Sequence, residues 1–265
     1  MLCVGIDVGA TKVAAGVVDT ERPEVFERRR IATVRDGREV LGDCVRLAEE
    51  LHRPGVEKLG VALCELVRPD HTIASAVTVD WTTLDVGGAF SHLGPAIVES
   101  DVRAAALAEA RFGAGRQRGS MLFVNIGSGI SHTMVVEGWP LTGARGNAII
   151  TGAPPVERWS SGLALARGAG GSTAKQALSD PARAGLVTDA ATRLGETLAT
   201  LINAFDPEVV VIGGGLGGAR RYREMVAAVA RALIYAPETR ELDVVPASLG
   251  PEAALIGAAI VAAEA

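Results

Sequence analysis

Short apolar runs and glycine-containing turns alternate at the start of the chain and again near its middle. Apolar residues fill most of positions 2–6 and 13–18, and a polar turn separates the two runs. The same arrangement returns at positions 121–124 and 130–136. Apolar runs of this length bounded by turn residues predict buried β-strands. The repetition therefore predicts two similar domains, each offering a strand–turn–strand unit to one shared ligand.

The two turns align residue by residue. Gly9 lies over Gly127, 118 positions further along the chain, and Asp7 lies over Asn125. Glycine permits positive φ and lets backbone amides approach an anion, which are the requirements of a phosphate-binding turn. The second turn supplies three candidate phosphate ligands, Gly127, Ser128 and Gly129.

The first turn offers more chemical groups than the second. Its candidate phosphate ligands are Gly9, Ala10, Thr11 and Lys12, which include a hydroxyl and a cation. Asp7, at the end of the preceding strand, suits a hydrated Mg²⁺ because this ion prefers carboxylate oxygens and water. An ordinary β-hairpin with a polar turn is the alternative interpretation, and the repetition disfavours it.

The rest of the chain alternates between predicted strands and predicted helices. Further strands are predicted at 25–32, 58–64, 97–99, 208–212 and 242–246. Helices are predicted at 37–52, 102–112, 183–205, 222–233 and 252–263. Because strands precede helices in both halves, the fold class is α/β. A cluster of Gly, Arg and Gln near 113–119 marks the expected domain boundary.

Composition and charge restrict the class of function. The chain has 265 residues, is 48% hydrophobic and carries a formal net charge of −5, which disfavours a nucleic-acid partner. No apolar stretch is long enough to span a bilayer, so no membrane partner is expected. The three cysteines have neither disulfide-like nor metal-ligand spacing. These properties predict a cytoplasmic enzyme.

A third glycine-rich turn, at 213–218, follows a very apolar strand. Its sequence satisfies G-x-G-x-x-G, so a dinucleotide site must be considered. A dinucleotide site requires an acidic residue at a strand end about 20 positions later, and none stands there. Too few residues also remain after the turn for a βαβ unit. We expect instead that an adenine ring lies against the bare glycine backbone, with a plain tight turn as the alternative.

Asp101 stands between a predicted strand and a predicted helix. One interpretation is an N-cap, because Asp is among the best capping residues. The other is a general base that takes a proton from an attacking hydroxyl, since phosphoryl transfer needs phosphate ligands, Mg²⁺ and one such carboxylate. In the second case Ser100 could take the cap.

Together these motifs resemble the ROK family of sugar kinases, within the actin, hexokinase and Hsp70 superfamily. Residues 7–12 resemble the first phosphate motif of the family, 125–129 the second, and 206–215 the adenosine motif. Residues 99–109 resemble the catalytic segment, usually written N-D-x-N-A-A-A-L-A-E. The resemblance runs through almost the whole chain.

The resemblance implies a two-domain, actin-like (ribonuclease H-like) α/β ATPase fold with a cleft between the domains. Residues 1–117 with about 250–265 would form the smaller domain, and 118–249 the larger one. The resemblance also implies a homodimer with ATP and Mg²⁺ as cofactors, and it makes Asp101 the general base. The residues implied to contact adenosine are Gly213, Gly214 and Gly215.

The chain departs from the family pattern where the sugar is normally bound. The family continues after the second turn with G-A-x-G-x-A-G-E-x-G-H and then a cysteine-rich zinc loop. Residues 143–148 begin this motif, but Ile150 stands at the Glu position and Ala153 at the His position. The zinc loop is absent, so no zinc site is expected. The remaining candidate acceptor ligands are Ser100, Asp101, Asn147 and Glu157.

This loss changes the expected acceptor. Replacing Glu and His removes groups that bind the anomeric end of a hexose, and an unpaired buried hydroxyl costs about 1–3 kcal/mol. We therefore expect a kinase for the primary hydroxyl of a sugar or sugar-like substrate, an amino sugar such as kanosamine or a C7-cyclitol rather than glucose. The alternative is a non-catalytic sugar- or nucleotide-binding sensor (pseudokinase) of the same fold.

Overall fold

The structure is a computed structural model, and it describes residues 1–152 and 154–265. Contacts within the chain divide it into two compact units. Unit 1 comprises Met1–Gly113, Pro140–Ala148 and Pro251–Ala265, and unit 2 comprises Ala114–Trp139 and Ile149–Gly250. The short segment Pro140–Ala148 thus joins unit 1 although unit 2 flanks it in sequence. The domain division expected from the sequence, at 117 and 250, stays a prediction.

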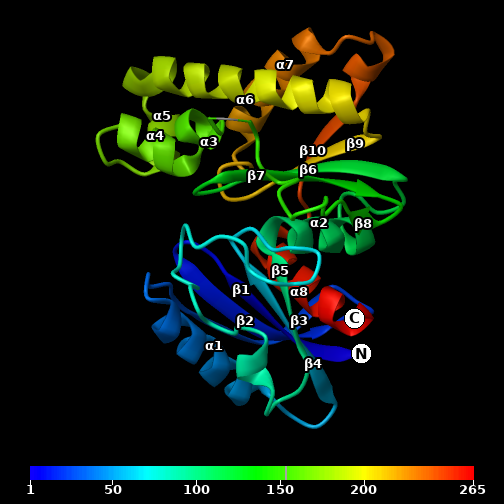
Figure 1. Cartoon of the computed structure of the whole chain (residues 1–265). Helices are drawn as coiled ribbons and strands as arrows, with labels where there is room; N and C mark the ends of the chain where they lie inside the picture. Colours follow the sequence, from blue (N-terminus) through cyan, green and yellow to red (C-terminus); the bar gives the residue numbers. More distant parts are fainter. Residues whose placement is uncertain (153) are drawn as a thin grey trace. The chain divides into compact units, whose positions relative to one another are not determined.

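Unit 1 is built on a five-stranded sheet of order β3-β2-β1-β4-β5 (Figure 1). Its strands are β1 Leu2–Val8, β2 Lys12–Asp19, β3 Glu24–Ala32, β4 Val56–Leu63 and β5 Ala96–Ser100. Its helices are α1 Gly37–Leu51, η1 Gly88–Phe90, α2 Asp101–Phe112 and α8 Ala253–Glu264, and η4 Gly250–Glu252 leads into α8. β1, β4 and β5 are parallel, and β2 and β3 run antiparallel beside β1.

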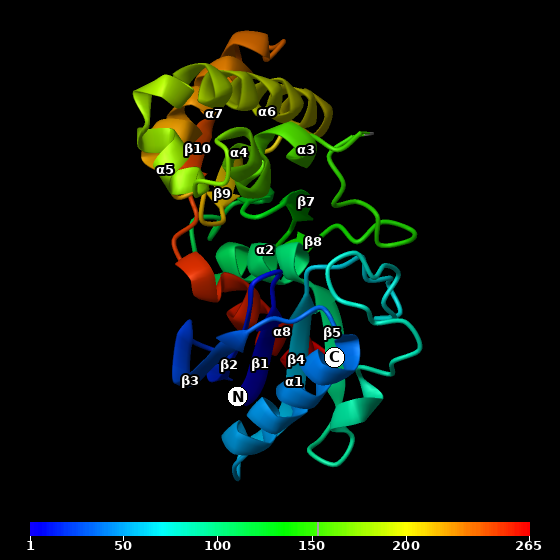
Figure 2. The same cartoon turned by 90° about the vertical axis from the view of Figure 1, so that its left-hand side faces the viewer.

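Helices cover both faces of this sheet. Figure 2 shows α1 in front of the sheet and α8 behind it. Val4 and Ile6 of β1 pack in one core with Leu47 of α1, since alternate side chains of a strand share a face. Gly5 lies on the other face, where a Cβ would overlap the carbonyl oxygen of Leu255. The α8 backbone therefore packs directly onto β1.

Unit 2 repeats this architecture with a second five-stranded sheet of order β10-β9-β6-β7-β8. Its strands are β6 Ser120–Ile126, β7 Ile130–Val136, β8 Trp139–Pro140, β9 Val209–Gly213 and β10 Asp243–Pro246. Its helices are α3 Glu157–Ser160, α4 Gly162–Gly168, α5 Ala174–Ser179, η2 Pro181–Arg183, α6 Ala184–Phe205, α7 Arg220–Leu233 and η3 Glu238–Glu241. Buried side chains of α6, α7, β6 and β9 form one apolar core.

The two sheets have the same topology. In each, the first strand of a hairpin is central, its hairpin partner lies antiparallel on one side, and a later strand lies parallel on the other. β1 of unit 1 therefore corresponds to β6 of unit 2. The duplication predicted from the repeated turns is confirmed at the level of the fold.

The predicted elements are confirmed, with small differences at their ends. The helix predicted from 102 begins one residue earlier, at Asp101, and the long helix predicted from 183 begins at Ala184 after a short 3₁₀ turn. Its end at Phe205 is as predicted, because Asp206 adopts a left-handed conformation before Pro207. Among the described residues, no helix is long and apolar enough to cross a membrane.

Candidate active site

Strand register brings candidate residues of unit 1 to one edge of the first sheet. Val8 of β1 pairs with Leu63 of β4, and Leu63 pairs with Ser100 of β5. The carboxyl ends of these three parallel strands therefore lie at the same level. Asp7 and Asp101 are within one residue of this edge, two strands apart, although 94 positions separate them in sequence. The structure thus brings the predicted metal ligand and the predicted base together within unit 1.

Asp7 is a buried carboxylate near the end of β1. Its side chain is 8% exposed. Burial raises the pKa of Asp7 to about 6, and the nearby positive charge of Lys12 opposes this rise. A bound cation would stabilise the ionised form of this buried carboxylate, and the expected role of Asp7 as a Mg²⁺ ligand stays a prediction.

Asp101 is the first residue of α2 and is half-buried. Burial is the main cause that raises its pKa, to about 7, and the negative charges of Asp7 and Glu65 add to the rise. A hydrogen bond from the backbone of Val102 and the positive charge of Arg103 act in the opposite direction. A carboxylate that titrates near neutral pH is suited to accept a proton from a hydroxyl.

The capping interpretation of Asp101 is wrong. Ser100 occupies the N-cap position of α2, and Asp101 is already helical. The Ser100 side chain makes no capping bond either; its backbone N–H donates to Oε1 of Glu99 at 2.6 Å. Ser100 Oγ is buried and has no hydrogen-bond partner within the described part of the chain. A buried hydroxyl without a partner is unusual in a folded protein, and the acceptor contact expected of Ser100 stays a prediction.

The first turn is closed by its own backbone. Gly9 N–H donates to the carbonyl oxygen of Lys12 at 2.9 Å, and Thr33 Oγ1 donates to the carbonyl of Gly9 at 2.8 Å. Ala10 and Thr11 are exposed at its tip, and Lys12 is half-buried. The hydroxyl of Thr11 and the ammonium of Lys12 lie on the same turn as the predicted phosphate amides.

The positive φ expected of the turn glycines is wrong. Gly9, Gly127 and Gly129 are not among the described glycines with positive φ. Both hairpins close without a left-handed residue, because Gly9 N–H bonds Lys12 and Gly127 N–H bonds the carbonyl of Gly129. The space beside the second turn is open, since a Cβ added to Gly127 would meet no atom within 4 Å.

The second turn lies against the start of α4 in unit 2. Gly162 N–H donates to the carbonyl of Gly127 at 2.8 Å, and Leu163 N–H donates to that of Ser128 at 3.3 Å. Ser161 caps α4 by accepting a bond from the backbone of Ala164. These bonds fix the turn on the body of unit 2.

Glu157 contacts the same turn. Its Oε2 accepts a hydrogen bond from the backbone N–H of Ile130 at 3.2 Å, and a Cβ added to Gly129 would come within 2.8 Å of the same oxygen. Glu157 is half-buried, and its role as an acceptor ligand stays a prediction. The structure places Glu157 beside the predicted phosphate ligands of unit 2.

The third glycine-rich loop follows β9 and returns to the second turn. Gly213 ends β9 and is buried, and Gly214 and Gly215 are exposed. Gly214 has a φ of 83°, and a Cβ there would overlap the carbonyl oxygen of Ile126. Only glycine fits this backbone, so the predicted adenosine loop and the second phosphate turn are neighbours within unit 2.

Glu65 is a candidate site residue that the sequence did not reveal. It is 4% exposed and follows β4 at the same edge of the sheet as Asp7. Its carboxylate accepts four hydrogen bonds, from Ser75 Oγ at 2.5 Å and from the backbone N–H groups of residues 77, 78 and 79. An acidic residue directly after an apolar strand was the available signal, the same one that identified Asp7.

The predicted acceptor residues are divided between the two units. Ser100 and Asn147 belong to unit 1, where Asn147 is exposed, and Glu157 belongs to unit 2. Ile150, which replaces the Glu of the family pattern, is 47% exposed in unit 2. Ala153, at the His position, lies outside the described residues.

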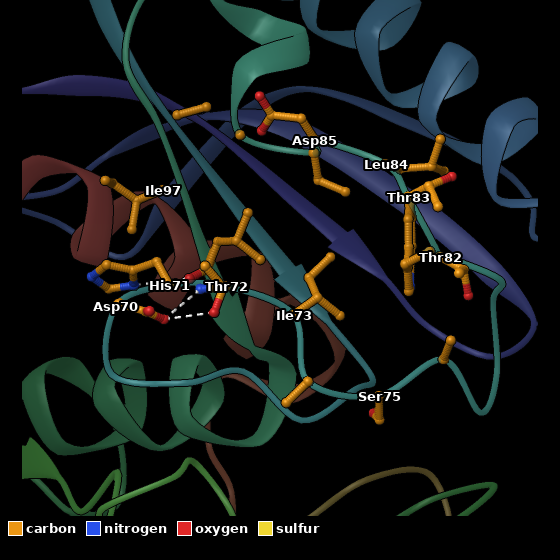
Figure 3. Close-up of a pocket in the computed structure, with 17 residues that line it drawn as sticks. Asp70, His71, Thr72, Ile73, Ser75, Thr82, Thr83, Leu84, Asp85 and Ile97 are labelled. Atoms are coloured by element: carbon orange, nitrogen blue, oxygen red, sulfur yellow. Dashed lines mark hydrogen bonds between the residues drawn. The ribbon is translucent and has the colours of Figure 1, made fainter.

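A cavity of about 680 Å³ lies in unit 1 beside the edge strand β5 (Figure 3). Residues 70–76, 81–87 and 96–98 line it. His71 Nδ1 donates to the carbonyl of Val98 at 3.0 Å across its wall, and Asp70 accepts bonds from Thr72. The predicted phosphate, base and acceptor residues are not among those that line this cavity. In residues 1–152 and 154–265, no group of three or more His, Cys, Asp or Glu could hold a metal ion.

Comparison with known proteins adds evidence independent of this geometry. The sequence model of the ROK family matches residues 3–162 and 156–265. The bifunctional enzyme NanE/NanK of Brucella melitensis is 35% identical over 187 residues, which cover 64% of this chain and 35% of that enzyme. The chain therefore spans well under half the length of these bifunctional relatives.

Other relatives match over almost the full length of the chain. Glucokinase of Streptomyces coelicolor is 28% identical and covers 99% of this chain and 98% of its own. A solved ROK family glucokinase from Streptomyces griseus, in complex with glucose and AMPPNP, has a TM-score of 0.88 at 25% identity and covers 100% of both chains. These matches confirm the predicted resemblance and the actin-like, two-domain α/β fold: the chain belongs to the ROK family.

Proposed function

We propose that this protein is an ATP-dependent carbohydrate kinase that transfers the γ-phosphate to the primary hydroxyl of an amino sugar such as kanosamine or of a C7-cyclitol. The observation that carries the proposal is the pair of carboxylates, Asp7 and Asp101, at the carboxyl edge of the first sheet. Both have raised pKa values, and Asp7 contributes to the rise at Asp101. Full-length relatives that are sugar kinases support it.

In the proposed reaction Asp101 accepts the proton of the acceptor hydroxyl. The hydroxyl oxygen forms a bond to the γ-phosphorus while the bond from that phosphorus to the bridging oxygen breaks, and ADP leaves. Asp101 needs no covalent role, because phosphoryl transfer depends mainly on positioning and charge stabilisation. Its pKa near 7 leaves a large ionised fraction at neutral pH.

The glycine turns would bind the nucleotide. Amides and side chains at Gly9, Ala10, Thr11 and Lys12 are the proposed ligands in unit 1. Those in unit 2 are Gly127, Ser128 and Gly129 for phosphate, and Gly213, Gly214 and Gly215 for adenosine. A bound Mg²⁺ would neutralise phosphate charge, and Asp7 would hold it directly or through water. The AMPPNP complex of the Streptomyces griseus glucokinase supports ATP as the nucleotide.

The acceptor class follows from what the chain lacks and keeps. Ile150 cannot accept a hydrogen bond from a sugar hydroxyl, so the anomeric end of glucose would lose a partner there. Ser100 keeps an unpaired buried hydroxyl, and Asn147 keeps an exposed amide. Together with Glu157, these groups suit an acceptor whose reacting end is polar and whose other end needs fewer hydrogen-bond partners.

A non-catalytic sensor of the same fold is the second candidate. One observation favours it: Glu157 places a carboxylate on the amide of Ile130, beside the second phosphate turn, where its charge would repel phosphate. Mg²⁺ or movement of the Glu157 side chain would relieve this repulsion in a kinase. Retention of Asp7, Lys12 and Asp101 favours the kinase.

The test measures ADP release from Mg·ATP with glucose, glucosamine, kanosamine, N-acetylmannosamine and C7-cyclitols. We expect turnover with kanosamine or a C7-cyclitol and a lower kcat/KM for glucose. Measurable ATP binding without turnover on any acceptor would support the sensor instead. A clear preference for glucose would contradict the proposed acceptor class.

We further propose a cytoplasmic homodimer. Several apolar side chains of unit 2 are exposed in the single chain, and exposed apolar surface is typical of protein interfaces. The most exposed are Val136 at 51%, Leu233 at 51%, Leu163 at 52%, Trp139 at 54% and Tyr235 at 90%.

A further inference from the structure

Arg103 is a charged side chain in the interior of unit 1. It lies in the first turn of α2, two residues after Asp101, and only 1% of its side chain is exposed. A buried guanidinium is costly unless its N–H donors are paired. The hydrogen-bond partners of Arg103 therefore indicate which parts of unit 1 this buried side chain connects.

Three separate segments of unit 1 meet at this guanidinium. Arg103 Nε donates to Glu99 Oε1 at 2.8 Å, which links α2 to the end of β5. The Nη2 group donates to the carbonyl of Val67 at 2.7 Å, in the loop after β4. The Nη1 group donates to the carbonyl of Gly146 at 3.2 Å.

Gly146 belongs to residues 143–148, which we call the acceptor segment because they include Asn147. Gly146 has a φ of 77°, and a Cβ on it would overlap the carbonyl oxygen of Val67. The acceptor segment therefore lies directly on the loop after β4. Arg103 donates to the carbonyls of Val67 and Gly146 at this contact. One side chain of α2 therefore binds both backbone segments.

The catalytic pattern N-D-x-N-A-A-A-L-A-E has Asn where this chain has Arg103. An Asn amide has two N–H donors on a short stem, whereas the guanidinium has five in a planar fork. Only the longer group can bond Glu99, Val67 and Gly146 together. The arrangement is thus specific to the sequence of this chain.

We infer that Arg103 is a positioning residue, which holds the acceptor segment against helix α2 and so fixes Asn147 relative to Asp101. The inference rests on the proposed function in that Asn147 binds the acceptor. It makes Arg103 a determinant of acceptor affinity without contact to the acceptor. Glu99 supports it by balancing its charge and orienting the fork.

The test compares Arg103→Lys with Arg111→Lys, a matched control on the same helix whose arginine pairs with Glu264 at 2.8 Å. Lysine keeps the charge but cannot span three acceptors. In Arg103→Lys we expect the KM for the acceptor to rise about tenfold or more, with the KM for ATP and kcat changed less than about threefold. Amide hydrogen exchange in 143–148 should quicken about tenfold, because local opening becomes easier.

The exchange measurement keeps the inference falsifiable without turnover. If Arg103→Lys is folded and exchanges in 143–148 at the wild-type rate, the positioning role is overturned, whatever the activity. An equal loss of enzymatic activity in Arg103→Lys and Arg111→Lys would show a merely structural role for Arg103. That result would also overturn the inference. A wild-type enzyme that turns over no acceptor contradicts the proposed function alone, and the exchange rates then decide the role of Arg103. Should Arg103→Lys fail to fold, Glu99→Gln tests the same contact, with a smaller expected increase in exchange.

Discussion

At the scale of single residues, the proposed chemistry depends on carboxylates that the fold brings close to one another. Asp7, Glu65 and Asp101 lie at the carboxyl ends of three parallel strands, and the negative charges of Asp7 and Glu65 raise the pKa of Asp101. Their mutual repulsion and their burial keep Asp101 partly protonated near neutral pH. The activity and the stability of the protein should therefore both depend on pH.

The pH dependence of kcat/KM should follow the ionisation of Asp101. Because the ionised form accepts the proton, kcat/KM should fall about tenfold per pH unit below pH 7. Replacing Glu65 by Gln removes a negative charge that raises the pKa of Asp101, so the midpoint of this decline should move to lower pH. A pH profile that stays flat between pH 5 and 8 in both proteins would contradict the role of Asp101.

Asp101→Asn should also change stability in a pH-dependent direction. The pKa of Asp101 is raised in the folded state, so its contribution to stability is complete below the unfolded pKa near 4 and is lost as pH rises through about 7. Asn does not ionise, so the Asp101→Asn variant does not lose this stability as the pH rises. Without nucleotide, the variant should be more stable than wild type by about 2 kcal/mol at pH 8 and nearly equal at pH 4. Urea unfolding at the two pH values measures it, and a variant less stable at pH 8 would refute the burial argument.

At the scale of elements, close contacts between backbones hold unit 1 together. Gly257 of α8 faces α2, where a Cβ would overlap the carbonyl oxygen of Ala104. Gly5 of β1 faces α8 in the same manner. The helix that begins with Asp101 is thereby seated on α8, and α8 on the sheet that carries Asp7.

A pair of glycine substitutions tests this packing. Gly257→Ala should destabilise the protein by about 2–4 kcal/mol, because the added methyl group forces two helices apart. Gly42→Ala in α1 is the matched control, since a Cβ there meets no atom within 4 Å. The control should gain about 0.5–1 kcal/mol from higher helix propensity. Equal effects on the midpoint of thermal unfolding would contradict the proposed helix contact.

Elements were the part of the structure most readily predicted from the sequence. Apolar runs and turn residues located the strands of both hairpins, and the repeated glycines at 9 and 127 indicated the duplication. Contacts that depend on distant pairing could not be predicted. Glu65 became a site residue only because β4 pairs with β1, and Arg103 only because its fork reaches the carbonyls of Val67 and Gly146.

At the scale of the whole molecule, the chain comprises two units whose sheets share one topology but whose helices and loops differ. Unit 1 carries the paired carboxylates and the acceptor segment, and unit 2 carries the second turn and the glycine loop after β9. The assignment of Pro140–Ala148 to unit 1 could not be predicted, because nothing in the sequence interrupts the chain on either side of it. The division expected from the sequence, which stays a prediction, placed this segment in the larger domain, 118–249.

The proposed homodimer is tested by sedimentation. The chain has a mass of 27.3 kDa, and we expect a species of twice that mass at micromolar concentration. Burial of the exposed apolar side chains of unit 2 is the physical reason. A single species of 27.3 kDa across the concentration range would contradict the proposal.

Comparison of Asp101→Asn with wild type tests whether Asp101 is the base of a phosphoryl transfer. The measurement is transfer of γ-phosphate from Mg·ATP to the best acceptor, with ATP affinity determined on the same samples by calorimetry. We predict that the variant binds ATP within about threefold of wild type and loses at least about a thousandfold in kcat, since Asn cannot accept the proton. Near-normal turnover in Asp101→Asn would contradict the account.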